Sequence, residues 1–493
     1  MPRTFDRQRQ ERAPLYEALE AYRAEANTPF HMPGHMQGRG AAPQLRQLMG
    51  KRALACDITQ VLDMDDIHRP ASYTKEAQEL AAQYFGARQT WFLVNGSTCG
   101  NQAALLAALR PSGEVILPRC AHRSLQAGLI LSGAYPIYAS SPYDQEAGVS
   151  LPVELEELER LAKLHPQALA WAVTSVTPYG ACAQMEGICQ AAQSHGVPLL
   201  VDEAWGPHFG VIPQLPPSAL EFGADCVVQS CHKLLGALSQ GSMLHWQGEK
   251  LAPERLNLAL RMLQSTSPSY LILASLDLAR RQLALDGERD WLRTWKLALE
   301  LRQWLNRQPG FRLLERGSAW DYDPTRIVIS ALPLGIDGVE LERTLRYRFQ
   351  IQAEMSDLAN VVLVLTPAHG EREIELLQKA LSTIASEPHG WISREGAAAP
   401  LRRVAQMGFP GFPQLLLTPR QAYFSPTRSL PWEEAFGLPC AELITPYPPG
   451  IPLICPGERL EREHWLYLRE LQRVGIPLDG LSDPHLERVL VCA

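Results

Sequence analysis

Three kinds of segment are missing from this sequence of 493 residues. No run of about 18 apolar residues occurs, so no membrane-spanning helix is expected. Residues 1–25 are charged and lack the apolar centre of a signal peptide. The ten cysteines are scattered, with no CxxC pair and no Cys/His spacing that suits zinc. We therefore expect a cytoplasmic protein with reduced thiols, no membrane contact and no bound metal.

A basic excess is also missing. Lysine and arginine number 46 against 53 acidic residues, which gives a net charge of -7 and argues against a nucleic-acid partner. Neither GxGxxG nor GxxxxGK[ST] opens a βα unit, so a plain nucleotide-binding module fits poorly. The 46% hydrophobic and 20% charged residues are ordinary for a soluble globular protein. A chain of this length predicts two to four domains.

Between residues 90 and 245, short apolar runs alternate with helical patterns. Continuous apolar strands that alternate with helices indicate a mainly parallel sheet covered on both faces. The sequence therefore predicts an α/β fold with a mainly parallel seven-stranded sheet. The expected strands are 91–94, 114–117, 136–139, 168–176, 198–202, 226–230 and 242–245, and the helices between them are 100–109, 124–131, 153–164 and 185–194.

The rest of the chain divides into smaller parts. A helix at 288–307, strands at 326–330 and 361–366, and helices at 338–349 and 370–386 predict a smaller α/β domain. Beyond residue 395 the composition changes, and the segment TPYPPGIP (445–452) is too proline-rich for a helix or a central strand. We predict an N-terminal helical segment (1–30), a large domain (31–285), a small α/β domain (286–394) and a mixed C-terminal domain (395–493).

The segment SCHK, which ends at Lys233, follows a predicted buried strand. A loop at the carboxyl end of a parallel sheet is where such folds bind ligands. A lysine amine there can form a Schiff base with an aldehyde cofactor once its surroundings favour the neutral amine. A lysine considered alone would more readily be interpreted as an exposed loop residue, so its neighbours decide the interpretation.

Asp202 closes the predicted strand LLVD, 31 residues before Lys233. That spacing is about one strand–helix–strand unit, so both side chains can reach the same edge of the sheet. Pyridoxal phosphate needs a carboxylate beside its pyridine nitrogen, so that the ring can accept electrons from the breaking bond. An acid at this position is otherwise often a turn or a helix cap.

The segment from Asn95 to Thr98 joins another predicted strand to a helix. Free N–H groups at a helix N-terminus bind phosphate, Gly96 permits a close approach, and Ser97 and Thr98 add hydroxyl donors. An ordinary N-cap uses the same residue types. Ser230 and His232 are further candidate donors to this phosphate.

His122 follows the predicted strand 114–117. A flat imidazole there can stack on the face of the cofactor ring. A lone histidine is more often structural, but its place at the next strand end supports the functional interpretation. The combination, rather than any single residue, indicates a pyridoxal-phosphate site.

At these residues the chain resembles the ornithine/lysine/arginine decarboxylase family of fold-type I pyridoxal-phosphate enzymes. The resemblance covers nearly the whole chain, and the SxHK and TPYPPGIP segments carry most of its specificity. The matching segments are HMPGH (31–35), TKEAQ (74–78), FLVNGST (92–98), RCAHRS (119–124), DEAW (202–205), SCHK (230–233) and TPYPPGIP (445–452).

The resemblance implies a role for each matching residue. Lys233 would carry the Schiff base, Asp202 would pair with the pyridine nitrogen and His122 would stack on the ring. The phosphate would be held by Ser97, Thr98, Ser230 and His232, together with the turn at Gly96. The motifs begin near residue 30, which resembles the short form without a receiver-like domain. Family members build their sites at dimer interfaces, which implies a homodimer or a larger homo-oligomer.

Several positions depart from the family pattern. Cys120 and Ala121 stand where the family has Asn and Cys, Arg123 replaces a lysine, and Gln60 replaces a glutamate. The order of residues around 176–179 is also altered. These changes leave the cofactor residues intact and put the substrate preference in doubt.

The predicted activity is decarboxylation of a basic amino acid to its amine and carbon dioxide, in polyamine synthesis. Family analogy favours arginine as the substrate, with lysine and ornithine as alternatives. An aminotransferase and a non-catalytic regulatory homologue remain open. The distal cation of the substrate needs an acid or a polar clamp. The candidate substrate contacts are Glu442, Asp63, Asp65, Asp66, His31, His35 and Trp205, and for each a structural role is the competing interpretation.

Overall fold

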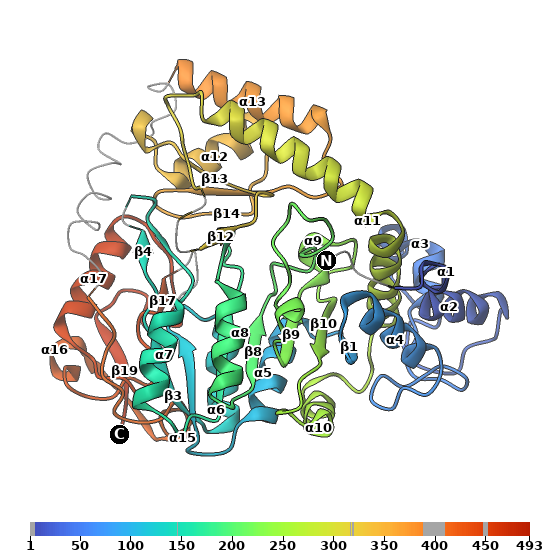
Figure 1. Cartoon of the computed structure of the whole chain (residues 1–493), viewed down its shortest axis with the longest axis horizontal. Coiled ribbons are helices and arrows are strands. Elements are labelled where there is room, and N and C mark those ends of the chain that lie inside the picture. Colours follow the sequence, from blue (N-terminus) through green and yellow to red (C-terminus); the bar gives the residue numbers. More distant parts are fainter. Residues whose placement is uncertain (1–4, 145, 316, 318–319, 388–409, 447–451) are drawn as a thin grey trace. The chain divides into compact units, whose positions relative to one another are not determined.

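The computed structural model describes residues 5–144, 146–315, 317, 320–387, 410–446 and 452–493 (Figure 1). The chain divides into two compact units, which are described separately. The first comprises Met1–Ala108 and Met185–Trp291, and the second comprises Leu109–Gln184 and Leu292–Ala493. The domain boundaries expected from the sequence stay a prediction, and the boundary near residue 394 lies outside the described residues.

The first unit begins with the helical segment that the sequence predicts. Helix α1 (Arg7–Gln10) is capped by Asp6, and α2 (Pro14–Ala24) begins at a proline, which suits the first helical position. Leu15, Leu19 and Tyr22 recur at helical spacing and are buried. Two further helices follow: α3 (Pro43–Cys56) and α4 (Tyr73–Phe85).

Four strands of the large sheet lie in the first unit, in the order β1 (Gln89–Leu93), β10 (Ser242–Trp246), β9 (Cys226–Gln229) and β8 (Leu199–Asp202). Strands β8 and β9 are parallel, whereas β10 runs antiparallel to β1 and β9. Residues 230–241, which include a short helix, join β9 to β10. The helices are α5 (Gly96–Ala108), α8 (Met185–Ser194), α9 (Cys231–Leu234), α10 (Pro253–Leu263) and the 3-10 turn η1 (Ala219–Phe222).

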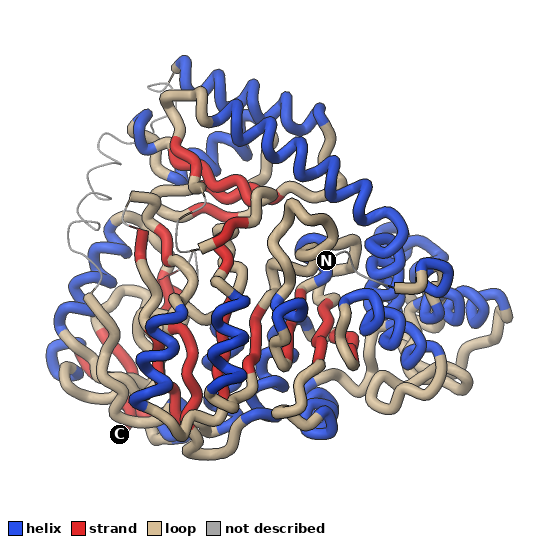
Figure 2. Tube along the Cα trace, viewed as in Figure 1, coloured by secondary structure: helices blue, strands red, loops and turns tan. Residues whose placement is uncertain are grey.

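The other three strands of the sheet lie in the second unit. They are β6 (Ala170–Thr174), β2 (Glu114–Pro118) and β3 (Tyr135–Ala139), and β2 is parallel to both neighbours. Figure 2 draws the strands of the chain in red and its helices in blue. Helices α6 (Arg123–Ser132) and α7 (Leu155–Leu164) accompany them. All seven predicted strands are present, within a few residues at each end, and the predicted mainly parallel α/β fold is confirmed.

The long helix α11 (Tyr270–Leu305) is 36 residues long, so the prediction that it begins at residue 288 was wrong. Gly287 interrupts the helical pattern, but a glycine inside a helix costs only about 1 kcal/mol relative to alanine. Tyr270, Leu273 and Leu276 are fully buried on the earlier turns. Their burial outweighs the weak local signal and extends the helix toward its N-terminus.

A four-stranded antiparallel sheet follows in the second unit, in the order β11 (Arg312–Leu313), β13 (Arg326–Ser330), β15 (Val361–Val364) and β14 (Met355–Ser356). Helices α12 (Gly338–Phe349) and α13 (Glu371–Ser386) begin and end close to the predicted residues. This sheet and its helices share a separate hydrophobic core, which includes Leu301, Ile327, Leu345 and Leu381. The small two-stranded pairs are β4 (Tyr143–Asp144) with β5 (Val149–Ser150), and β7 (Ala181–Cys182) with β12 (Asp321–Tyr322).

The C-terminal part has a second separate core, centred on Trp432, Ile444, Leu468 and Val491. Strands β16 (Thr427–Pro431) and β19 (Arg488–Cys492) pair over five residues, and β17 (Thr445–Pro446) pairs with β18 (Leu478–Asp479). The proline-rich segment enters as the two-residue strand β17, and residues 447–451 lie outside the described part of the chain. The helices of this C-terminal part are α15 (Pro419–Phe424), α16 (Trp432–Ala435) and α17 (Arg462–Arg473).

All ten cysteines are free thiols, and nine of them are buried. Among the described helices, none combines the length and the apolar character that a membrane crossing requires.

Candidate active site

Asp202 and Lys233 lie at the carboxyl ends of neighbouring parallel strands. Asp202 is the last residue of β8, in register with Val228 of β9. Strand β9 ends at Gln229, and the short helix α9 that follows contains Lys233. The backbone N–H of Ser230 also bonds to the carbonyl of Ala204, at 3.2 Å, so the two strand ends continue side by side. The structure therefore brings the predicted acid and the predicted lysine to one edge of the sheet.

Lys233 is partly buried, and its Nζ lies 3.8 Å from the centre of the Trp205 ring. A cation over an indole face is attracted by the ring electrons. Trp205 was expected to contact the substrate, and the structure places it against the lysine. This contact holds the lysine amine close to the strand end that carries Asp202, three residues before Trp205.

Asp202 is 6% exposed, and both of its carboxylate oxygens accept hydrogen bonds. Oδ1 accepts from the N–H of Ala204 at 3.1 Å, and Oδ2 accepts from the side-chain amide of Asn101 at 2.9 Å. Asn101 was missed in the sequence. Its signal is a polar residue on a buried helix face, four positions after Ser97, where residues share one side of the helix.

Three serine hydroxyls converge where the phosphate was expected. The Oγ atoms of Ser97 and Ser230 lie 2.6 Å apart, and Ser97 also donates to Ser242 at 3.2 Å. All three serines are buried. Ser242 begins β10 and was not singled out from the sequence, because nothing local marks a serine at a strand start. Thr98, by contrast, is exposed.

The turn before α5 has the backbone that the sequence predicts. Gly96 has φ +74°, a conformation that favours glycine, and no atom lies within 4 Å of where a Cβ would stand. Its N–H, however, donates to the carbonyl of Gln240 at 3.0 Å. Gly96 therefore shapes the loop, and the candidate donors for an anion are the following N–H groups of the first turn of α5 and the serine hydroxyls.

His232 follows Ser230 in α9 and is partly buried. Its Nδ1 lies 3.0 Å from the carbonyl oxygen of Gly241, which can only accept, so Nδ1 carries a proton. Nε2 would then donate to a phosphate only if the ring is fully protonated.

His122 belongs to the second unit, at the N-cap of α6. The imidazole is exposed, and its Nδ1 interacts with the N–H of Ser124 at 3.2 Å and with the Ser124 hydroxyl at 2.9 Å. The ring is thus anchored at one edge by the first turn of the helix. Its predicted stacking role stays a prediction.

The histidines of the HMPGH segment have both ring nitrogens engaged locally. His35 accepts at Nδ1 from the N–H of Gly38 and faces Asp57 through Nε2 at 3.1 Å. His31 contacts Tyr22 through Nε2 and the carbonyl of Met32 through Nδ1, both at 2.7 Å. These contacts support the structural interpretation of the segment.

The acidic candidates differ sharply in their surroundings. The Asp65 carboxylate accepts from the N–H groups of Ala71, Ser72 and Thr74, which commits it to the loop before α4. Asp66 accepts from the side chain of Gln60 and the N–H of His68, and Asp63 is exposed.

Glu442, in the second unit, is 5% exposed. Its Oε1 accepts from the N–H of Ser482 at 2.7 Å, while its buried Oε2 has no hydrogen-bond partner within the described ranges. Burial raises the pKa of this carboxyl. A buried acceptor of this kind can take a donor from a ligand.

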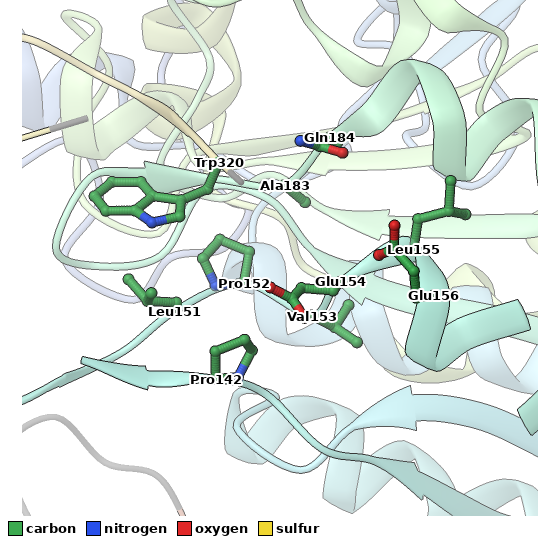
Figure 3. A pocket seen from close by; sticks show the side chains of 10 residues that line it. All are labelled: Pro142, Leu151, Pro152, Val153, Glu154, Leu155, Glu156, Ala183, Gln184 and Trp320. Carbon is green, nitrogen blue, oxygen red and sulfur yellow. The ribbon is translucent and has the colours of Figure 1, made fainter. Parts of the chain in front are cut away.

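Two other features of the second unit carry no candidate residue. One is a pocket of about 250 Å³ lined by Pro152, Glu154, Glu156 and Trp320, among others (Figure 3). The other is the trio Glu461, Glu463 and His464, whose ligand atoms lie within 4.8 Å of one another at the start of α17. A helix N-terminus disfavours a cation, and we assign no metal to this trio.

Comparison with known proteins identifies the family. The model of the Orn/Lys/Arg decarboxylase major domain matches residues 13–321, and the model of the C-terminal domain of the same family matches residues 402–483. The chain belongs to the Orn/Lys/Arg decarboxylase family. Membership of this family makes it an amino-acid decarboxylase, as the strand-end residues predict.

Individual members of the decarboxylase family match over almost the whole chain. An arginine decarboxylase of Bacillus subtilis (strain 168) is 36% identical and covers 98% of both chains. An arginine decarboxylase of Halalkalibacterium halodurans is 37% identical and covers 96% of both chains. The structure of the constitutive lysine decarboxylase of E. coli matches 98% of this chain and 82% of its own, with a TM-score of 0.84. At 23% sequence identity it shows the shared fold.

Proposed function

We propose that this family member decarboxylates arginine in preference to lysine or ornithine, with pyridoxal phosphate as its cofactor. The observation that carries the proposal is the pairing of Asp202 and Lys233 on adjacent strand ends, beside the serine cluster of the same unit. The preference for arginine rests on the two full-length relatives that are named arginine decarboxylases.

The residues present fit the chemistry of this cofactor. Lys233 offers the amine that an aldehyde requires, and Ser97, Ser230 and Ser242 offer hydroxyl donors for a phosphate. Asp202 offers a buried carboxylate for a ring nitrogen. When bound, pyridoxal phosphate supplies an electron sink for the bond that breaks at the substrate Cα.

The protein then supplies orientation and charge. Asp202 is fixed by its two donors and presents a negative charge at the strand end. Lys233 would hold the cofactor through its Nζ amine, the group that reacts with an aldehyde. Trp205 would help to orient this side chain, through the contact of Nζ with its ring.

Two residues of the second unit complete the proposal. For His122 we keep the stacking role that the family resemblance implies, and within its own unit the imidazole is exposed and anchored at one edge. Glu442 would bind the distal guanidinium of arginine, because its Oε2 is a buried acceptor without a described partner. Of the acidic candidates, Glu442 is favoured over Asp65, whose oxygens are already occupied by backbone donors.

We propose further that the chain acts as a homodimer or a larger homo-oligomer in the cytoplasm, in the synthesis of polyamines. Residues 30–62 expose a set of large apolar side chains, which is unusual for a monomer and suits burial against a second copy. Size-exclusion chromatography with light scattering would test this assembly, and a monomer at all concentrations would contradict it. The exposed side chains are Phe30, Met32, Leu45, Leu48, Met49 and Leu62.

The activity is tested by measuring carbon dioxide released from arginine, lysine and ornithine. The expected result is cofactor-dependent release, highest with arginine, that is lost together with the absorbance of the bound cofactor in Lys233→Ala. Lys75→Ala is the matched control, because Lys75 is a solvent-exposed lysine that pairs only weakly with Glu79, at 3.9 Å. Higher turnover of lysine or ornithine would overturn the arginine preference. Conversion that depends on a keto acid would indicate transamination, and a protein that never takes up the cofactor would indicate a non-catalytic homologue.

A further inference from the structure

Helix α5 carries two polar side chains on its buried side, four residues apart. Ser97 lies at its first turn and joins the hydroxyls of Ser230 and Ser242. Asn101 lies one turn later, is 3% exposed and donates to Asp202. Residues at this spacing are neighbours on one helix face. One rigid element therefore holds both the hydroxyl cluster and the contact to the acid.

We propose that Asn101 is a positioning residue, which sets the orientation of the Asp202 carboxylate toward the ring nitrogen of the cofactor. This inference rests on the proposed use of pyridoxal phosphate. Oδ1 of Asp202 is tied to the N–H of Ala204, two residues along its own chain, which leaves the carboxylate free to turn about that point. The bond from Asn101 to Oδ2 is the second anchor, and it comes from a different element.

The chemistry of an amide suits this task. The side-chain nitrogen of Asn101 is a donor and the amide is neutral, so it fixes an anion without competing with a pyridinium for it. A carboxylate oxygen has two acceptor sites, so Oδ2 can take the bond from Asn101 and still face a second donor. Helix α5 also carries Ser97, so one element would contact the cofactor phosphate and would orient the Asp202 carboxylate toward the ring nitrogen.

The test compares Asn101→Ala and Asn101→Asp with Gln102→Ala. Gln102 is the next residue of the same helix and is only partly buried, so its loss controls for changes to α5 itself. Two readouts besides turnover apply: the dissociation constant for pyridoxal phosphate, measured by spectral titration, and the pH dependence of the absorbance of the bound cofactor.

Asn101→Ala is expected to weaken cofactor binding about tenfold, to shift the pH midpoint of the absorbance and to lower kcat at least tenfold, with KM changed by about twofold or less. Gln102→Ala should leave all of these unchanged. In Asn101→Asp two carboxyls face each other, so one of them must hold a proton before the bond to Asp202 can form. Its cofactor absorbance and turnover should therefore recover as the pH falls, which a merely structural role would not produce.

Wild-type cofactor affinity and an unchanged pH midpoint in Asn101→Ala would overturn the inference, as would equal losses in Gln102→Ala. If Asn101→Ala does not fold, Asn101→Asp decides, and the absence of recovery at low pH then overturns it. The proposed function fails separately, when the wild-type protein takes up no pyridoxal phosphate or releases no carbon dioxide.

Discussion

A buried ion pair in the second unit gives a prediction that can be worked out from the structure. Arg119, directly after β2, and Glu458, in the C-terminal part, have side chains that are 0% and 1% exposed. The guanidinium of Arg119 binds both oxygens of Glu458 and also donates to the carbonyls of Pro452, at 3.3 Å, and Leu453, at 2.8 Å. Glu458 additionally accepts from the N–H of Cys455. The pair thus links the end of β2 to the segment that follows residue 451.

Glu458→Gln keeps the shape of the side chain and leaves Arg119 as a buried cation without its counter-charge. Removing one partner of such a pair costs about 3–5 kcal/mol. The same parts of the chain share an exposed pair, Arg123 with Asp479 at 2.9 Å, whose side chains are 64% and 60% exposed. An exposed pair contributes roughly 0.2–1 kcal/mol, so Asp479→Asn is the matched control.

Hydrogen exchange of the paired strands β16 and β19 measures the effect, because it reports local opening in a protein of several parts. A loss of about 3 kcal/mol corresponds to an acceleration of about a hundredfold, since 1.4 kcal/mol is a factor of ten. Asp479→Asn should change exchange by about fivefold or less. Equal acceleration in the two variants, or less than about tenfold in Glu458→Gln, would refute the reasoning.

The remaining predictions concern buried acids of the second unit. The Tyr179 hydroxyl donates to Asp357, at 2.7 Å, so Tyr179→Phe should lower the free energy of unfolding by about 1.5–3 kcal/mol in a denaturant titration, and a loss below about 0.5 kcal/mol would contradict this. Burial raises the pKa of the Glu442 carboxyl, so protonation of this group adds to the free energy of unfolding at low pH. That added stability is lost as the pH rises through the pKa of the folded state. Glu442→Gln, whose Oε1 can still accept from Ser482, should melt at a higher temperature than wild type at neutral pH. Its melting temperature should also fall less than that of wild type above about pH 4.5. Parallel plots of melting temperature against pH for the two proteins would contradict this prediction. Turnover of arginine should fall in the same variant if Glu442 binds the guanidinium.

The strands could be predicted because their signal is local. Each strand of the large sheet is a short apolar run between a helical pattern and a turn, and all seven predicted runs became strands. Asp202 and Lys233 were placed together by strand order alone, since the carboxyl ends of parallel strands meet at one edge. The helix α11 was predicted too short because Gly287 interrupts the periodic pattern that would mark its N-terminal half. Burial of apolar side chains, rather than a local sequence signal, stabilises that half.

By itself the sequence determined the α/β fold, the family and the residues at the end of each strand. Strand periodicity, turn residues and short motifs depend only on residues that are near one another in the chain. Only the tertiary structure decided which side chains meet across elements. Asn101 reaches Asp202 from 101 positions away and Ser242 reaches Ser97 from 145, while Trp205 proved to face Lys233 and Asp65 proved to be held by backbone N–H groups. Such contacts depend on how elements pack, which no local pattern records.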